Sequence, residues 1–150
     1  MSRRPPVFIV GAHRSGTTWL TQQLAETGLF SVLTAFHVIE WQGIEAAARG
    51  DGPRPDPSDL RQRLQSLGLS HRATDEVVIR PDTPEEYGYL LLQGGQKSWL
   101  KATSVPLLKR VVDVLQAEHP DRTVLLKNPW DYGNEEALLD AFPDARFIAI

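Results

Sequence analysis

The stretch that decides the fold class of this chain is Val7-Phe8-Ile9-Val10-Gly11-Ala12-His13-Arg14-Ser15-Gly16-Thr17-Thr18-Trp19-Leu20. Its four leading apolar residues predict a buried strand of a parallel sheet. A loop of small residues follows and leads directly into a helical pattern, in which Leu20 and Leu24 share one face and Gly28 ends the helix. A strand, a glycine-containing loop and a helix in this order are typical of a phosphate-binding loop.

The loop has the spacing of G-x-x-x-x-G-K-[ST], with Gly11 and Gly16 as the glycines and Thr17 where a nucleoside triphosphatase carries its lysine. Backbone N–H groups of such a loop converge on an anion, and the positive end of the helix dipole points to the same place. Thr17 and Thr18 add hydroxyl donors, and the cation has moved to Arg14 inside the loop. This arrangement suits a small anion held by one guanidinium better than a β,γ-phosphate with its magnesium.

Composition narrows the remaining classes of function. The 150 residues are 41% hydrophobic and 23% charged, which predicts one α/β domain over residues 1–150. The net charge of −3 gives no general attraction to nucleic acid or to an anionic membrane. The chain has no cysteine and its four histidines lack ligand spacing, so we expect no metal site. With no membrane-span-length apolar run and no signal-peptide pattern, the expected location is the cytoplasm.

The rest of the chain predicts helices and two more parallel strands. Helical patterns cover residues 59–67, 84–92 and 106–117, and another helix follows the cap Asn134. Thr83 is the expected N-cap of the second of these, with Pro84 at its first position and Glu86 closing a capping box. Residues 77–79, flanked by Arg72, Asp75 and Arg80, suggest a short strand. The core strands after the first are expected at 123–126 and 145–150, which predicts a P-loop-like parallel sheet flanked by helices, with a helical insertion between the first and second core strands.

Lys127 follows the second core strand directly. Ligands of an open parallel sheet bind outside the carboxyl ends of its strands, where the glycine loop also lies. Lys127 is therefore expected beside the loop, as a second cation for the same anion.

Two blocks of this sequence resemble those of sulfotransferases that use 3′-phosphoadenosine 5′-phosphosulfate (PAPS). The run R-S-G-T-T-W-L resembles their 5′-phosphosulfate-binding loop, and L-L-K-N-P-W with L-L-D-A-F-P-D-A-R-F-I resembles the second block of bacterial sulfotransferases. The resemblance implies that Trp19 lies near the adenine and that Lys127 contacts the transferring sulfuryl group. For the mechanism, we assign Arg14 and Lys127 to the sulfuryl and leaving-group oxygens. It also implies that the 5′-phosphosulfate is held by Arg14, Ser15, Gly16, Thr17 and Thr18.

The sequence departs from that family pattern in two places. Cytosolic sulfotransferases carry a catalytic histidine two residues after the lysine, whereas Pro129 stands there in this chain. We therefore expect the base to be His37, whose ordinary pKa lies near working pH, with Glu40 as the second choice. The family's 3′-phosphate-binding block would begin after Ile150, so we expect the chain to be the N-terminal part of a longer enzyme.

The predicted activity is metal-free transfer of a sulfuryl group from PAPS to a hydroxyl of a small-molecule or carbohydrate acceptor. Two alternatives stay open: a P-loop nucleoside triphosphatase or small-molecule kinase, and a non-catalytic nucleotide-binding module. Four aromatic residues either form an apolar wall for the acceptor or pack in the core: Trp41, Tyr87, Tyr89 and Trp130.

Overall fold

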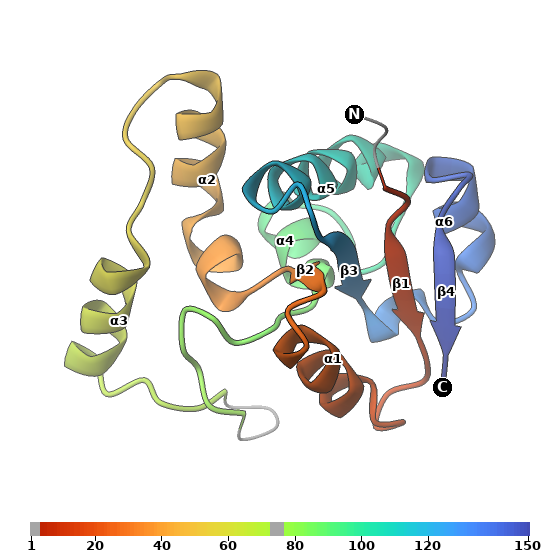
Figure 1. Cartoon of the computed structure of the whole chain (residues 1–150), viewed down its shortest axis with the longest axis horizontal. Helices are drawn as coiled ribbons and strands as arrows, with labels where there is room; N and C mark the ends of the chain where they lie inside the picture. The colour runs from red at the N-terminus through yellow and green to blue at the C-terminus, as the bar shows by residue number, and fades with distance from the viewer. Residues whose placement is uncertain (1–3, 73–76) are drawn as a thin grey trace. The chain divides into compact units, whose positions relative to one another are not determined.

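The structure, a computed structural model, describes residues 4–72 and 77–150 and divides into two compact units. The first combines the described residues up to Leu33 with Glu86–Ile150, and the second is Thr34–Glu85. The first unit contains a four-stranded sheet in the order β2-β3-β1-β4, with every neighbouring pair parallel (Figure 1). Its strands are β1 (Val7–Val10), β2 (Phe30–Val32), β3 (Thr123–Lys127) and β4 (Arg146–Ala149).

One face of this sheet is covered by α1 (Thr17–Glu26). Val7 and Ile9 of β1 point to this face together with Leu125 of β3, and Leu20 and Leu24 of α1 pack on them. The predicted spacing of the two leucines is therefore the spacing that buries α1 against the sheet.

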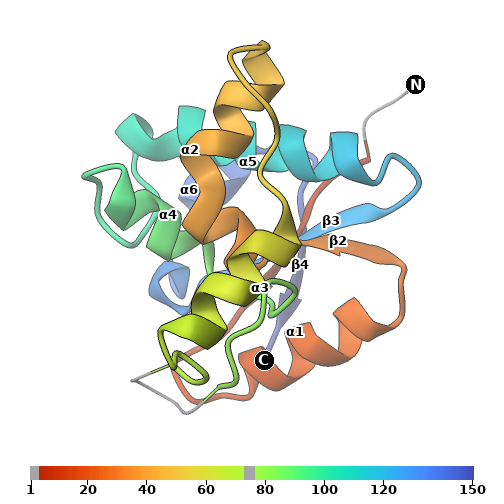
Figure 2. The same cartoon turned by 90° about the vertical axis from the view of Figure 1, so that its left-hand side faces the viewer.

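The opposite face carries α4 (Tyr87–Gln93), α5 (Val105–Glu118) and α6 (Glu135–Ala141). Phe8, which alternates with Val7 and Ile9 along β1, has its ring against Tyr87 of α4 and against Phe142 just after α6. Figure 2 shows α1 on one side of the sheet and α5 on the other. The predicted fold class, a P-loop-like parallel sheet flanked by helices, is confirmed.

The edge strand β2 was not predicted. It has only three residues, and its central Ser31 breaks the apolar run that signals a buried strand. Ser31 is nevertheless buried, because its hydroxyl donates a hydrogen bond of 2.9 Å to the carbonyl of Leu115 in α5. The helical insertion therefore lies between β2 and β3.

The second unit holds α2 (Ala35–Arg49) and α3 (Pro57–Ser66). The helix α3 starts two residues before the predicted one, since the side chain of Asp56 accepts a hydrogen bond from the N–H of Ser58. The short strand predicted at 77–79 is a single bridge between His71 and Val78. Asp75, one of the charges expected to flank it, lies outside the described residues.

The predicted start of α4 is wrong by three residues. Its N-cap is Glu86, not Thr83, and the helix begins at Tyr87. The hydroxyl of Thr83 instead donates to the carbonyl of Val78, and the carbonyl of Thr83 accepts from the N–H of Ala35. Pairing with a distant segment therefore overrides the local capping preference.

Candidate functional site

The loop after β1 folds tightly over Gly11. A Cβ atom at this position would lie 2.8 Å from Oγ of Ser15 and 2.9 Å from Cγ2 of Thr17, so only glycine fits. Arg14 and Gly16 have φ angles of 63° and 92°, in the left-handed region. Two such residues in one short loop turn the backbone sharply into the first turn of α1.

The start of α1 is short of internal partners. Gly16 is its N-cap and provides no side-chain hydrogen bond, so the first-turn N–H groups lack a side-chain cap. The hydroxyl of Ser15 is buried and has no hydrogen-bond partner within residues 4–72 and 77–150. Unsatisfied buried donors are rare in proteins, and this one lies at the positive end of a helix. The loop therefore has the chemistry of an anion-binding site.

Lys127 is 3% exposed and lies where β3 ends, in register with Ile9 of β1. Its Nζ donates to Oγ1 of Thr18 at 3.0 Å and to Oε1 of Glu86 at 2.7 Å. The predicted placement of Lys127 beside the loop is found in the structure, because the carboxyl ends of adjacent parallel strands open at one edge.

Glu86 is the residue of this site that the sequence analysis missed, since it was explained as part of a helix cap. It is 7% exposed and forms a buried ion pair with Lys127, 41 residues away in the chain. No local signal in the sequence marks it, because its partner is distant in the chain and its own surroundings have the composition of a helix cap.

The other predicted loop residues differ in exposure. Thr17 is 4% exposed and fills the position of the usual P-loop lysine. Arg14 is exposed and makes no ion pair with any residue that the structure describes. Trp19 is 65% exposed, so its indole is not part of the core.

The segment after β3 is built around Asp131, which is fully buried. Its carboxylate accepts hydrogen bonds from the hydroxyl of Tyr87 at 2.5 Å, the backbone N–H of Leu100 at 2.8 Å, and the side-chain amides of Asn128 at 2.8 Å and Asn134 at 2.7 Å. Burial first, and then the negative charge of Asp131, raises the pKa of Tyr87 well above its ordinary value. Tyr87 therefore remains a protonated donor.

The four aromatic residues separate into two groups. Trp41 in the second unit and Tyr87 in the first are buried in the cores of their units. Trp130 and Tyr89 are half-buried, and the Trp130 ring meets the rings of Tyr89 and of His13 edge to face at 5.6 and 5.5 Å. Because His13 belongs to the loop after β1, these three rings lie within the same unit as Lys127.

The two predicted bases, His37 and Glu40, belong to α2 in the second unit, whereas Lys127 and the loop belong to the first. His37 is buried, and its Nδ1 accepts the backbone N–H of Thr34 at 3.1 Å and lies 2.8 Å from the Thr34 hydroxyl. Glu40 forms an ion pair with Arg63. Each side chain thus has a structural contact within its own unit, and a catalytic role for either stays a prediction.

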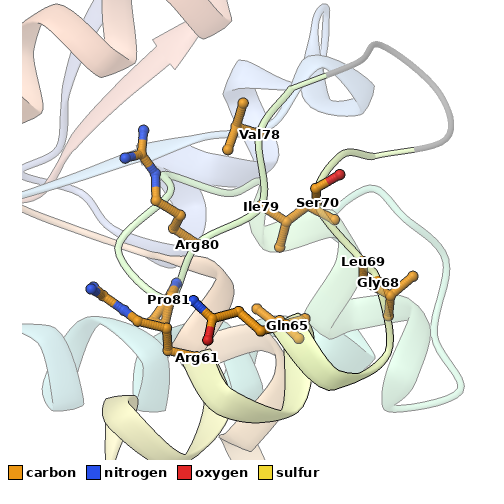
Figure 3. A pocket seen from close by; sticks show the side chains of 10 residues that line it. Arg61, Gln65, Gly68, Leu69, Ser70, Val78, Ile79, Arg80 and Pro81 are labelled. Carbon is orange, nitrogen blue, oxygen red and sulfur yellow. The ribbon is translucent and has the colours of Figure 1, made fainter.

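A cavity of about 490 Å³ lies within the second unit (Figure 3). It is formed by α3 and by residues 68–70 and 78–81, and none of the predicted site residues lines it. Its walls are mostly apolar, and Arg61 and Arg80 contribute guanidinium groups.

Among residues 4–72 and 77–150, no three His, Asp or Glu side chains are grouped so that they could hold a metal ion. Nor does any helix there have the length and apolar character needed to span a membrane.

Comparison with known proteins gives a match to a family model and a match to a solved structure. A model of the sulfotransferase family matches residues 5–150. The crystal structure of the sulfotransferase STF9 from Mycobacterium avium superimposes with a TM-score of 0.65 at 20% sequence identity, over 99% of this chain. The match covers 43% of that protein, so this chain spans less than half of its length. Among curated proteins, none matches this chain.

Proposed function

The chain belongs to the sulfotransferase family, and we propose that it transfers a sulfuryl group from PAPS to a hydroxyl of a small-molecule or carbohydrate acceptor. One observation carries the proposal: an uncapped helix start with a buried, unpartnered Ser15 hydroxyl lies beside the ammonium group of Lys127. A cation, backbone N–H groups and hydroxyl donors at one point are suited to a compact anion.

The loop residues fit the 5′-phosphosulfate of PAPS. The hydroxyl of Ser15 and the first N–H groups of α1 supply donors, and the exposed guanidinium of Arg14 supplies charge. The exposed indole of Trp19 offers a flat surface for adenine. Thr17 is buried in the position of the lysine that triphosphatases need, which disfavours a nucleoside triphosphatase or kinase.

In sulfuryl transfer, the acceptor oxygen forms a bond to sulfur while the bond from sulfur to the bridging phosphate oxygen breaks, and the acceptor proton passes to a base. Lys127 is assigned to the oxygens that gain negative charge, together with Arg14. Thr18, which already accepts a hydrogen bond from Lys127, keeps the ammonium group at the loop.

For the base, we add Glu86 to His37 and Glu40. Its carboxylate lies 2.7 Å from Nζ of Lys127, within the unit that holds the loop. A base must be within hydrogen-bond reach of the proton that it removes, and the position of this carboxylate beside the lysine assigned to the sulfuryl group supports Glu86 as a candidate. Turnover of Glu86→Gln, His37→Ala and Glu40→Ala, compared across pH, identifies the base. Glu86 is excluded if its variant keeps wild-type turnover.

The donor site is tested by calorimetric titration with adenosine 3′,5′-bisphosphate, without metal, and separately with ATP and magnesium. We expect the bisphosphate to bind without metal, and Arg14→Ala to weaken it by about 10- to 100-fold through loss of one charged contact. The matched control is Arg146→Ala, because Arg146 is exposed at the amino end of β4, opposite the loop edge.

Three outcomes separate the candidate functions. Metal-free binding of the bisphosphate with sulfuryl transfer to an alcohol supports the proposal. A preference for ATP with magnesium would replace it with a nucleoside triphosphatase or kinase. Binding of the bisphosphate without any transfer would leave a nucleotide-binding module.

A further inference from the structure

Three consecutive residues, the N-cap of α4 and the first two residues of the helix, contact the end of β3 and the segment that follows it. Glu86 pairs with Lys127, the last residue of β3, at 2.7 Å, and the hydroxyl of Tyr87 donates to Asp131 at 2.5 Å. Gly88 lies so close that a Cβ atom there would be 2.6 Å from Oδ1 of Asn128. The start of α4 is therefore attached by an ion pair and a hydrogen bond and packs closely at the next position.

Asp131 is the centre of this attachment. With four donors around a fully buried carboxylate, both of its oxygens are engaged: Oδ1 by Leu100 and Asn134, and Oδ2 by Tyr87 and Asn128. Tyr87 belongs to α4, Leu100 to the connection between α4 and α5, and the two asparagines to the segment after β3. A buried carboxylate with satisfied oxygens holds its partners in one arrangement, because any movement leaves a buried charge without a donor.

Tyr87 is the only one of these donors that is covalently next to Glu86. Its phenol is buried, and its ring packs edge to face on Phe8 in the centre of the sheet, with centroids 6.2 Å apart. A tyrosine held at both its ring and its hydroxyl leaves little freedom to the residue before it.

We propose that Tyr87 and Asp131 are positioning residues that hold the carboxylate of Glu86 against the ammonium group of Lys127. Neither residue touches the reacting atoms in this scheme. The inference rests on the proposed function for its catalytic consequence, since Glu86 and Lys127 are the groups assigned there to the proton and to the sulfuryl oxygens. Its geometric part concerns the ion pair alone and holds whether or not the enzyme turns over.

The test is Tyr87→Phe, which removes the hydroxyl and keeps the ring. The matched control is Tyr132→Phe, because Tyr132 is 61% exposed and makes no hydrogen bond through its hydroxyl to the described residues. The ion pair is followed at one fixed pH by the NMR chemical shift of the Glu86 carboxyl carbon in glutamate-labelled protein, with the Glu86→Gln variant assigning the signal. We expect the signal to move in Tyr87→Phe, because a loosened ion pair changes the surroundings of the carboxylate, and to stay in place in Tyr132→Phe.

Turnover provides the second readout. We expect Tyr87→Phe to lower kcat about tenfold, less than the 100-fold loss that a full 1 Å misplacement gives, with unchanged affinity for adenosine 3′,5′-bisphosphate. A loss of fold would lower affinity and kcat together, and Asp131→Asn is then compared by the same Glu86 chemical shift.

The failures of the two proposals are distinguishable. An unchanged Glu86 chemical shift in Tyr87→Phe overturns the positioning role whatever the activity. A changed chemical shift in a protein that transfers no sulfuryl group confirms the positioning of the pair and overturns the proposed function alone. Wild-type kcat in Tyr87→Phe despite a changed chemical shift overturns the catalytic consequence.

Discussion

Two segments leave neighbouring strands at the same edge of the sheet and differ in how their polar groups are satisfied. In the segment after β1, the Ser15 hydroxyl is buried without a partner among the described residues and the start of α1 has no side-chain cap. In the segment after β3, the Asp131 carboxylate accepts four hydrogen bonds. The unpartnered atom of the first segment is a hydroxyl that can donate, whereas in the second the Asp131 carboxylate is fully engaged and the unpartnered atom is an acceptor, Oδ1 of Asn128.

Lys127 joins the two segments. Its ammonium group donates to Thr18, in the first turn of α1, and to Glu86, at the start of the helix that Asp131 anchors through Tyr87. A cation that belongs to both a binding segment and a structural one can be held rigidly and still face a ligand. Substitutions in the two segments should therefore affect different quantities.

The largest contrast is expected between Asp131→Ala and Ser15→Ala in the free energy of unfolding, measured by urea denaturation. Asp131→Ala leaves four donors without their acceptor, several of them buried, and should lower the free energy of unfolding by about 4 kcal/mol. Ser15→Ala removes an unpartnered hydroxyl and should change it by less than about 0.5 kcal/mol. Equal losses in the two variants would show that both segments are structural.

The next contrast is in turnover. Arg14→Ala and Lys127→Ala should each lower kcat by about 10² to 10³, the usual effect of losing a transition-state donor. Only Lys127→Ala should also lower the free energy of unfolding, by about 3 kcal/mol, because it leaves the Glu86 carboxylate buried without its cation. Steady-state kinetics and urea denaturation of both variants test this. Near-normal turnover in both would contradict the assignment of these residues to the oxygens that gain negative charge.

The segment after β1 could be predicted from the sequence, because its signals are local. Four apolar residues, two glycines and a helical repeat of leucines all lie within one short stretch, and Lys127 follows from the rule for strand ends. The contact between Glu86 and Lys127 has no such signal. It depends on how α4 packs against β3, 41 residues away, which no spacing in the sequence encodes.

The start of α4 is a place where a local signal was present in the sequence but did not decide the structure. Thr83, Pro84 and Glu86 have the composition of a capping box, yet the backbone of Thr83 pairs with Ala35 and its hydroxyl bonds to Val78. Glu86 is then free to become the N-cap and to turn its carboxylate to Lys127. Tertiary contacts therefore overrode the local capping pattern.

A smaller effect on stability is expected from replacing one glycine by alanine at each segment. Gly16 belongs to the loop after β1, and Gly88 of α4 lies against the segment after β3. In Gly88→Ala, the new Cβ would lie 2.6 Å from Oδ1 of Asn128 and 2.7 Å from the carbonyl of Ser98, and overpacking should lower the free energy of unfolding by about 2–3 kcal/mol. In Gly16→Ala, no atom lies within 4 Å of the new Cβ, and only the φ of 92° opposes it, at about 1 kcal/mol. Urea denaturation measures both. A larger loss in Gly16→Ala would mean that the loop after β1 is the more tightly packed segment.

The smallest effect concerns the pH dependence of stability. Burial, followed by the charge of Asp131, raises the pKa of Tyr87 in the folded chain well above its ordinary value of about 10. Below pH 10 the phenol is protonated in both the folded and the unfolded chain, so it adds no pH dependence. Above pH 10 only the unfolded chain releases this proton, and the free energy of unfolding should fall by up to about 1.4 kcal/mol per pH unit.

Tyr87→Phe isolates this contribution, because the other tyrosines and the lysines titrate alike in both proteins. Urea denaturation at pH 9 and pH 10.5 should show a steeper loss of stability in the wild type than in the variant. Tyr132→Phe, which removes an exposed phenol, should retain the wild-type slope. Equal slopes in the wild type and Tyr87→Phe would mean that the phenol is not hydrogen-bonded to Asp131. The bond that holds Tyr87, and with it the neighbouring Glu86, to the segment after β3 would then be absent.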